Sequence, residues 1–198
     1  MVLHPRTLTA LLHRPLPEPP SVLRRGPFRE ARFSSPLHSE WVAARLGLWL
    51  AIAFGLCFVT GLYSHSLQNQ PHWAPWFPNR PVSLYRVTQG MHVATGLAAI
   101  PLLLAKLWTV YPRLWVWPPA RSVAHVLERG SLFLLVAGAG FQLLTGLLNV
   151  VGWYAFRFFF TPAHYWTAYI TVGAMLIHVG TKLPVTRRAL STKDPADA

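Results

Sequence analysis

The chain has 198 residues, of which 53% are hydrophobic and 12% are charged, whereas a typical soluble domain has about 25% charged residues. This composition argues against a cytosolic enzyme. The single cysteine, Cys57, excludes an internal disulfide and any zinc or iron–sulfur site built from thiolates, so metal chemistry would have to use histidine. The net charge of +12 suits either nucleic acid or an anionic membrane surface, and the positions of the charges decide between them.

Four stretches of the sequence carry no charged residue. They cover residues 46–79, of which 46–62 are almost wholly apolar, and residues 87–105, 130–156 and 158–181. About 20 apolar residues cross the hydrocarbon core of a bilayer, and a spanning backbone must close its own hydrogen bonds as a helix. The sequence therefore predicts an all-α membrane protein, a four-transmembrane-helix up-down bundle formed by residues 41–185.

The segments outside the spans set the expected orientation. Residues 1–40 are rich in Pro and Arg and are expected to form a disordered basic tail, and residues 186–198 a second, cytoplasmic tail. Of the 18 Lys and Arg residues, all but Arg80, Arg86 and Arg157 lie before the first span, between the second and third, or after the fourth. The positive-inside rule then places both termini in the cytoplasm and explains the basic charge without nucleic acid.

Three histidines fall at membrane depth, where an ionisable side chain is costly and usually functional. His164 and His178 are separated by fourteen residues of the fourth span, which is about 40° short of four full helical turns and a rise of about 21 Å. They should therefore face the same side of the bundle, one near each leaflet. This is the arrangement expected of one helix that ligates two stacked hemes.

The third histidine, His92, lies in the second span at a depth comparable with that of His164. Two neutral imidazoles that face each other across a bundle can hold the two axial positions of one heme iron. The uncharged windows contain no Asp or Glu, so non-heme iron and manganese sites built on carboxylates are not expected. His92 and His164 are thus the best candidates for heme iron ligands.

The tripeptide Thr-Gly-Leu occurs at the same end of three spans, at residues 60–62, 95–97 and 145–147. Up-down topology would bring the three copies together beside His164. Their small residues would leave room for a porphyrin, although small residues also allow close packing of membrane helices without a cofactor. Thr95 and Thr145 are candidates for hydrogen bonds that support the ligands.

The other candidates leave alternatives open. His178 would need a second ligand at its own depth, and the sequence offers His38 before the first span or His125 at the start of the third. His65, on the helix face of Gly61, could ligate, bind a heme propionate or a quinone, or lie in the interface. Arg86, at the mouth of the second span, could pair with heme propionates or a quinone headgroup, or only set the topology.

Two elements carry a family resemblance, namely His92-x-x-x-Gly96 and the spacing of His164 and His178. Over about residues 36–185 the chain resembles the bacterial four-helix cytochromes b that serve as membrane subunits of nickel-iron hydrogenases and formate dehydrogenases. The resemblance implies that His92 and His164 hold an outer heme and His178 an inner one. The remaining ligand of that family, a histidine in the first helix, has no counterpart here, because Arg45 stands about where it is expected.

Residues 84–90, 101–106 and 128–129 further resemble a narrower group, found with sulfite-oxidase-type molybdopterin oxidoreductases of actinobacteria. The expected protein is a heme b electron-transfer subunit, with one or two hemes, in the bacterial plasma membrane. It would link the quinone pool to a separate oxidoreductase subunit of the molybdopterin type, and would not catalyse substrate chemistry alone. The alternative is a membrane anchor or assembly scaffold without a cofactor.

Overall fold

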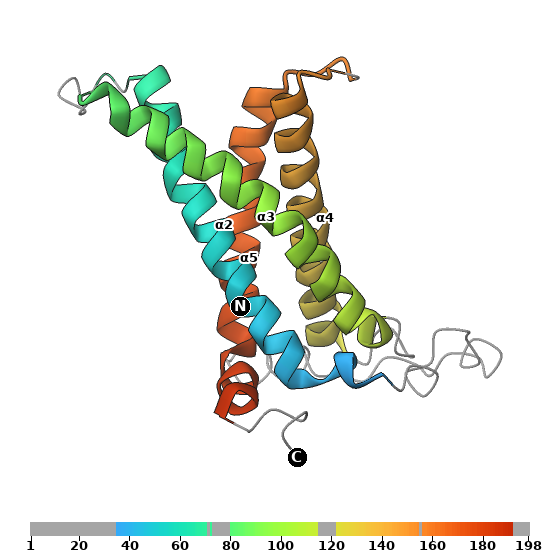
Figure 1. Ribbon diagram of the computed structural model, residues 1–198. Coiled ribbons are helices and arrows are strands. Elements are labelled where there is room, and N and C mark those ends of the chain that lie inside the picture. Colours follow the sequence, from blue (N-terminus) through green and yellow to red (C-terminus); the bar gives the residue numbers. More distant parts are fainter. Residues whose placement is uncertain (1–34, 71, 73–79, 115–121, 155, 192–198) are drawn as a thin grey trace.

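The computed structural model describes residues 35–70, 72, 80–114, 122–154 and 156–191. A short 3-10 helix, η3 (Pro36–His38), precedes four long helices: α2 (Glu40–Gln68), α3 (Val82–Leu114), α4 (Val123–Val151) and α5 (Phe160–Ser191) (Figure 1). All four are long and apolar enough to cross a membrane. The predicted all-α architecture, with four helices long and apolar enough to span a membrane, is thereby confirmed for the described part of the chain.

Consecutive helices run in opposite directions (Figure 1). We call the end where α2 and α4 begin the proximal end, and the end where they finish the distal end. The predicted helical domain stops at residue 185, whereas α5 continues to Ser191, so residues 186–191 are helical instead of part of a tail. The predicted disordered tail, residues 1–40, lies mostly outside the described residues.

Local sequence signals account for several helix ends. The hydroxyl of Ser39 accepts a hydrogen bond from the Val42 amide at 3.2 Å, and Ser122 does the same for His125 at 3.2 Å. Serine is a favoured residue at this position because its oxygen pairs an amide that the first helical turn leaves free. Helix α4 ends at Gly152, whose φ of 73° is a conformation that glycine adopts without steric cost.

The bundle buries small residues and exposes large ones. Apolar side chains such as Trp49, Leu104 and Trp166 are more than half exposed, as expected of surfaces that meet lipid acyl chains. Small residues let membrane helices approach closely, and this packing replaces the large apolar core of a soluble bundle. The buried small residues are Ala43, Ala44, Ala53, Thr60, Ser64, Ala99, Thr109, Ala139, Thr145, Thr171, Ala174 and Ala189.

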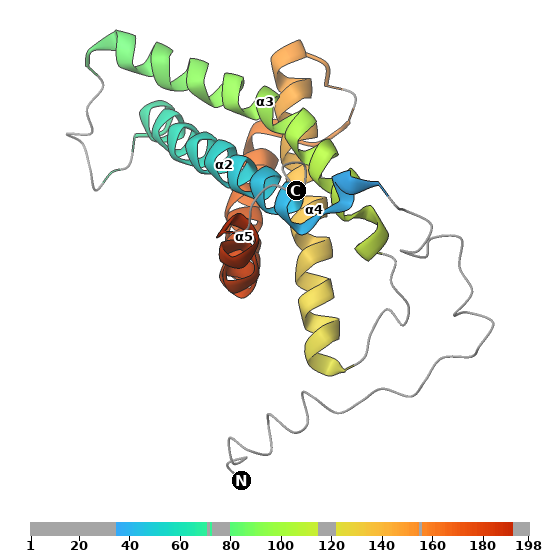
Figure 2. The ribbon, with the colours of Figure 1, turned by 60° about the horizontal axis from the view of Figure 1, so that its bottom comes forward.

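The four helices form two hairpins. Helix α2 packs mainly against α3, and α4 mainly against α5, while the contacts between the hairpins are fewer. A cluster around Leu50, Ala53 and Ala99 packs α2 against α3, and Leu143 of α4 joins it from the other hairpin. Toward the distal end the α2–α3 hairpin diverges from the α4–α5 hairpin (Figures 1 and 2).

Candidate functional site

A cavity opens between the two hairpins in the distal half of the bundle and is lined by all four long helices. It encloses about 1340 Å³ of empty space, part of which is continuous with the surroundings. The part of the cavity farthest from the distal end of the bundle, here called its deep end, has apolar lining residues such as Phe54, Ile100 and Val172. Its distal mouth has polar ones such as Ser64 and Gln89. Cofactor sites in proteins commonly have this form, apolar walls with a few placed polar groups.

His92 of α3 and His164 of α5 face each other inside this cavity. Their ring centres are 6.0 Å apart and their planes are inclined by 78°. An imidazole nitrogen lies about 2.0 Å from a first-row metal ion and about 1.1 Å from its own ring centre, so one ion between two imidazoles separates the ring centres by roughly 6 Å. The pair that the sequence singled out is thus brought together at a spacing that fits axial ligation.

The ring of His92 is fixed by α2. Its Nδ1 donates a hydrogen bond to the backbone carbonyl of Cys57 at 2.7 Å, and the Cys57 thiol donates to the carbonyl of His92 at 3.3 Å. Gly61 leaves the space that the ring occupies, since a Cβ atom there would lie 2.7 Å from Cε1 of His92. Because Nδ1 carries the proton, the lone pair of the imidazole is on Nε2.

The ring of His164 is fixed by α4 through a chain of two hydrogen bonds. Thr145, which is 2% exposed, lies with Oγ1 2.9 Å from Nδ1 of His164 and 2.7 Å from the carbonyl of Phe141. The carbonyl can only accept, so the hydroxyl proton of Thr145 goes to Phe141 and the hydroxyl oxygen accepts the proton of Nδ1. The lone pair of His164 is therefore also on Nε2.

A third contact holds the backbone around His164. Gln142 of α4 donates through Nε2 to the carbonyl of His164 at 2.9 Å and to the Thr167 hydroxyl at 2.6 Å. Gln142 is buried, so these bonds cross the α4–α5 interface away from solvent. In the described part of the chain, neither Nε2 of His92 nor that of His164 has a hydrogen-bond partner. Both ligand nitrogens remain available to a metal.

The Gly-Leu pairs of all three Thr-Gly-Leu copies line the cavity, but of their threonines only Thr145 does, and the members have different tasks. Gly61 accommodates the ring of His92, and a Cβ atom on Gly146 would lie 3.5 Å from the ring of His164. Gly96 instead faces Cys57, since a Cβ atom on Gly96 would lie 3.5 Å from the Cys57 thiol. Thr95 bonds the carbonyl of Met91 in its own helix at 2.7 Å, so of the two candidate supporting threonines only Thr145 reaches a histidine ring.

The two further candidates at the distal end differ in their placement. His65 lines the cavity mouth and stacks on Tyr165 of α5, with ring centres 3.7 Å apart and planes inclined by 16°. Arg86 is exposed on α3 and is not among the residues that line the cavity. The structure therefore brings His65, but not Arg86, to the site.

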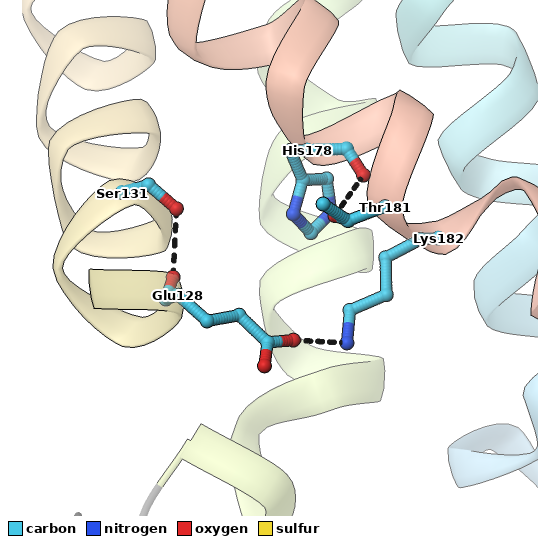
Figure 3. A network of polar contacts seen from close by, with 5 residues as sticks. All are labelled: Glu128, Ser131, His178, Thr181 and Lys182. Atoms are coloured by element: carbon cyan, nitrogen blue, oxygen red, sulfur yellow. Dashed lines mark hydrogen bonds and ion pairs between the residues drawn. The ribbon is translucent and has the colours of Figure 1, made fainter. Parts of the chain in front are cut away.

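His178 lies in the proximal half, among charged side chains. Lys182 of α5 and Glu128 of α4 form an ion pair at 2.5 Å beside it, and Thr181 bonds its backbone carbonyl at 2.9 Å (Figure 3). Lys106 of α3 donates to the carbonyl of Ala43 on α2. The proximal half of the bundle thus holds a half-buried amine, Lys106, and an exposed ion pair.

Neither proposed partner of His178 meets it. His38 lies with Nδ1 3.0 Å from the carbonyl of Thr109 and its ring centre 6.0 Å from that of Trp108. His125 belongs to the first turn of α4. Among the described residues no ring contact joins His178 to His38 or His125, so the structure assembles one histidine pair where the resemblance implies two sites.

Three residues with contacts to the site or the proximal half were not predicted from the sequence, namely Cys57, Gln142 and Lys106. Cys57 lies four residues before Gly61, hence on the same face of α2, which is the one signal that pointed to it. Gln142 and Lys106 are polar residues near or inside the third and second spans, and their partners depend on how the helices cross.

Comparison of the chain with known proteins finds no relative. No protein-family model, curated protein or solved structure matches the chain. The described residues also contain no group of three or more His, Cys, Asp or Glu side chains that could hold a metal ion by themselves. The histidine pair provides two ligands only, so an ion held there would need most of its coordination sphere from a cofactor.

The hydroxyl of Thr145 gives a specific test of this geometry. In a Thr145→Val variant the Nδ1 proton of His164 loses its acceptor, and the imidazole becomes a poorer electron donor. Loss of such a supporting hydrogen bond typically weakens metal affinity about 10- to 100-fold. For a heme held by this pair, we expect the affinity to fall within that range and the midpoint potential to rise, as measured by heme titration and redox potentiometry.

The matched control is Thr95→Val, which alters the same motif. The Thr95 hydroxyl bonds only carbonyls of its own helix, at 2.7 and 3.3 Å. Equal shifts of potential in the two variants would contradict the assignment of Thr145 to His164.

Proposed function

We propose that this protein binds heme b between His92 and His164 and carries electrons in a membrane. The observation that supports the proposal best is the facing pair of imidazoles, 6.0 Å apart, each with Nδ1 tied to a neighbouring helix. A tetrapyrrole supplies four equatorial ligands, which is what a site with only two protein ligands needs. When bound, heme supplies one-electron oxidation and reduction at its iron.

The residues of the chain then have defined tasks. His92 and His164 would both bind the heme iron, which would leave no open position for oxygen or substrate. Cys57 and Thr145 hold the two rings in the tautomer that presents Nε2, and such supporting bonds tune the potential of the iron. The apolar deep end excludes water. These tasks suit electron transfer better than catalysis of substrate chemistry.

The partners are proposed from the resemblance and from the membrane-spanning helices. Electrons would pass between the quinone pool of a bacterial plasma membrane and a separate oxidoreductase subunit of the molybdopterin type. Both chain termini would lie in the cytoplasm, which places the histidine pair in the outer leaflet. An anchor or scaffold without a cofactor is the competing function, in which the same histidine hydrogen bonds only join helices.

A reduced-minus-oxidised absorbance spectrum of the purified full-length protein distinguishes these two functions. Electron transfer predicts a heme α-band of the bis-histidine, low-spin type. If a folded sample supplied with heme showed no such band, the result would contradict electron transfer and favour the scaffold function.

Heme stoichiometry is a separate prediction. We expect about one heme per chain, because His178 has no facing histidine among the described residues and lies with Lys106 and the Glu128–Lys182 pair in the proximal half. Pyridine hemochrome quantitation against protein concentration measures this ratio. His178→Ala should retain the heme, and a ratio near two that falls to one in this variant would instead establish an inner heme at His178.

A further inference from the structure

Three hydrogen-bond donors at the distal mouth of the cavity have no acceptor in the described part of the protein. Ser64 of α2 is 3% exposed, and its Oγ has no partner. Gln89 of α3 lines the cavity and its amide makes no hydrogen bond. The third donor is His65. The Asn69 amide donates to its Nδ1 at 3.4 Å, so the proton of the neutral ring is on Nε2. This N–H group also has no acceptor among the described residues.

These donors lie one helical turn distal to the histidine pair. Gln89 precedes His92 by three residues on α3, and Ser64 follows Gly61, which abuts the His92 ring, by three residues on α2. Three residues of helix rise about 4.5 Å. The three donors therefore lie on the distal side of the imidazoles, and apolar side chains such as Phe54, Ile100 and Val172 line the other side.

The buried hydroxyl of Ser64 indicates a missing acceptor, and the half-buried Gln89 and His65 lie beside it at the cavity mouth. A buried polar group without a partner costs free energy, and nearly all such groups in native proteins are paired. Heme b is apolar along one edge and carries two carboxylates on the opposite edge, and each ionised carboxylate accepts several hydrogen bonds. Arg86, the cation that the sequence suggested for this role, is not among the lining residues.

We infer that heme b binds with its carboxylate edge toward the distal mouth, where Ser64, Gln89 and His65 donate hydrogen bonds to the carboxylates. This inference rests on the proposed function and adds the orientation of the cofactor and the residues that fix it. Neutral donors hold the carboxylates here, and the stacking of His65 on Tyr165, with ring centres 3.7 Å apart, fixes the position of the third donor.

The test compares heme b with its dimethyl ester, in which both carboxylates are blocked. Full-length protein from heme-depleted cells is titrated with each compound, for the wild type and for a Ser64→Ala/Gln89→Leu double variant. Hydrogen bonds to charged groups are stronger than neutral ones, so we expect the wild type to bind heme b at least about tenfold more tightly than the ester. The double variant should lose most of this preference while it binds the ester as the wild type does.

Ser66→Ala is the matched control, because the Ser66 hydroxyl bonds the Leu62 carbonyl of its own helix at 2.9 Å and does not line the cavity. Unaltered ester binding also reports that the double variant is folded. Equal affinity of the wild type for the two compounds, or an equal loss for both in the double variant, would overturn the orientation alone. Failure of the wild type to bind either compound would overturn the proposed function itself, and the inference with it.

Discussion

His92→Ala and His164→Ala variants are each expected to purify with little or no heme. Either change removes one of the two axial ligands, and the remaining imidazole is held by its own helix neighbour, so it cannot move to replace the lost one. Loss of supporting hydrogen bonds alone typically costs 10- to 100-fold in metal affinity, and loss of a ligand should cost more. Pyridine hemochrome content and the α-band measure the effect.

Two controls accompany these variants. His72→Ala alters an exposed histidine outside the cavity and should retain full heme content. Circular dichroism establishes whether the ligand variants keep their helices, and His92→Gln provides a variant of similar polarity and volume. Heme content and a spectrum equal to the wild type in His92→Ala would place the ligand elsewhere.

Gly61→Ala is the second change for which we expect a large effect. The added Cβ would lie 2.7 Å from Cε1 and 2.8 Å from Nδ1 of His92, closer than real Cβ contacts allow. The His92 ring must therefore shift, which breaks the bond from Nδ1 to the Cys57 carbonyl and moves Nε2 away from His164. We expect the heme content to fall by at least about tenfold, as for loss of a supporting bond in a metal site.

Gly55 of the same helix offers a matched control. A Cβ atom at Gly55 would meet no other group within 4 Å, so Gly55→Ala should keep full heme content and gain slightly in helix stability. Heme content is measured for both variants after the same purification. If Gly61→Ala bound as much heme as Gly55→Ala, the His92 ring would not occupy the position described.

The sequence was sufficient to predict the helices and the central pair of the site. A long uncharged stretch that crosses a membrane must close its own backbone hydrogen bonds, which a helix does, so the four helices could be predicted from composition. His92 and His164 could be paired because up-down topology brings the second and fourth spans to one depth at the same end. The Thr-Gly-Leu copies were predicted to meet for the same reason.

Other features depend on how the helices cross, which no single sequence position encodes. Arg86 and Gln89 are three residues apart, so they lie only about 60° apart around α3, and Arg86 is about 4.5 Å nearer the distal end. Of the two, only Gln89 lines the cavity, so the difference lies in depth along the helix. The roles of Cys57 and Gln142 arise from atoms of two helices that meet at one crossing. His38 was a candidate ligand because it lies just before the first span, and its bond to the Thr109 carbonyl appears only once η3 is placed against α3.

The two-hairpin architecture has a consequence for assembly. His92 belongs to the α2–α3 hairpin and His164 to the α4–α5 hairpin, and the hairpins touch each other less than their own members do. An iron ion bound by both imidazoles would join the two hairpins across their interface. Each hairpin could then enter the bilayer as an independent unit, and cofactor capture would be the event that locks the two halves into one molecule.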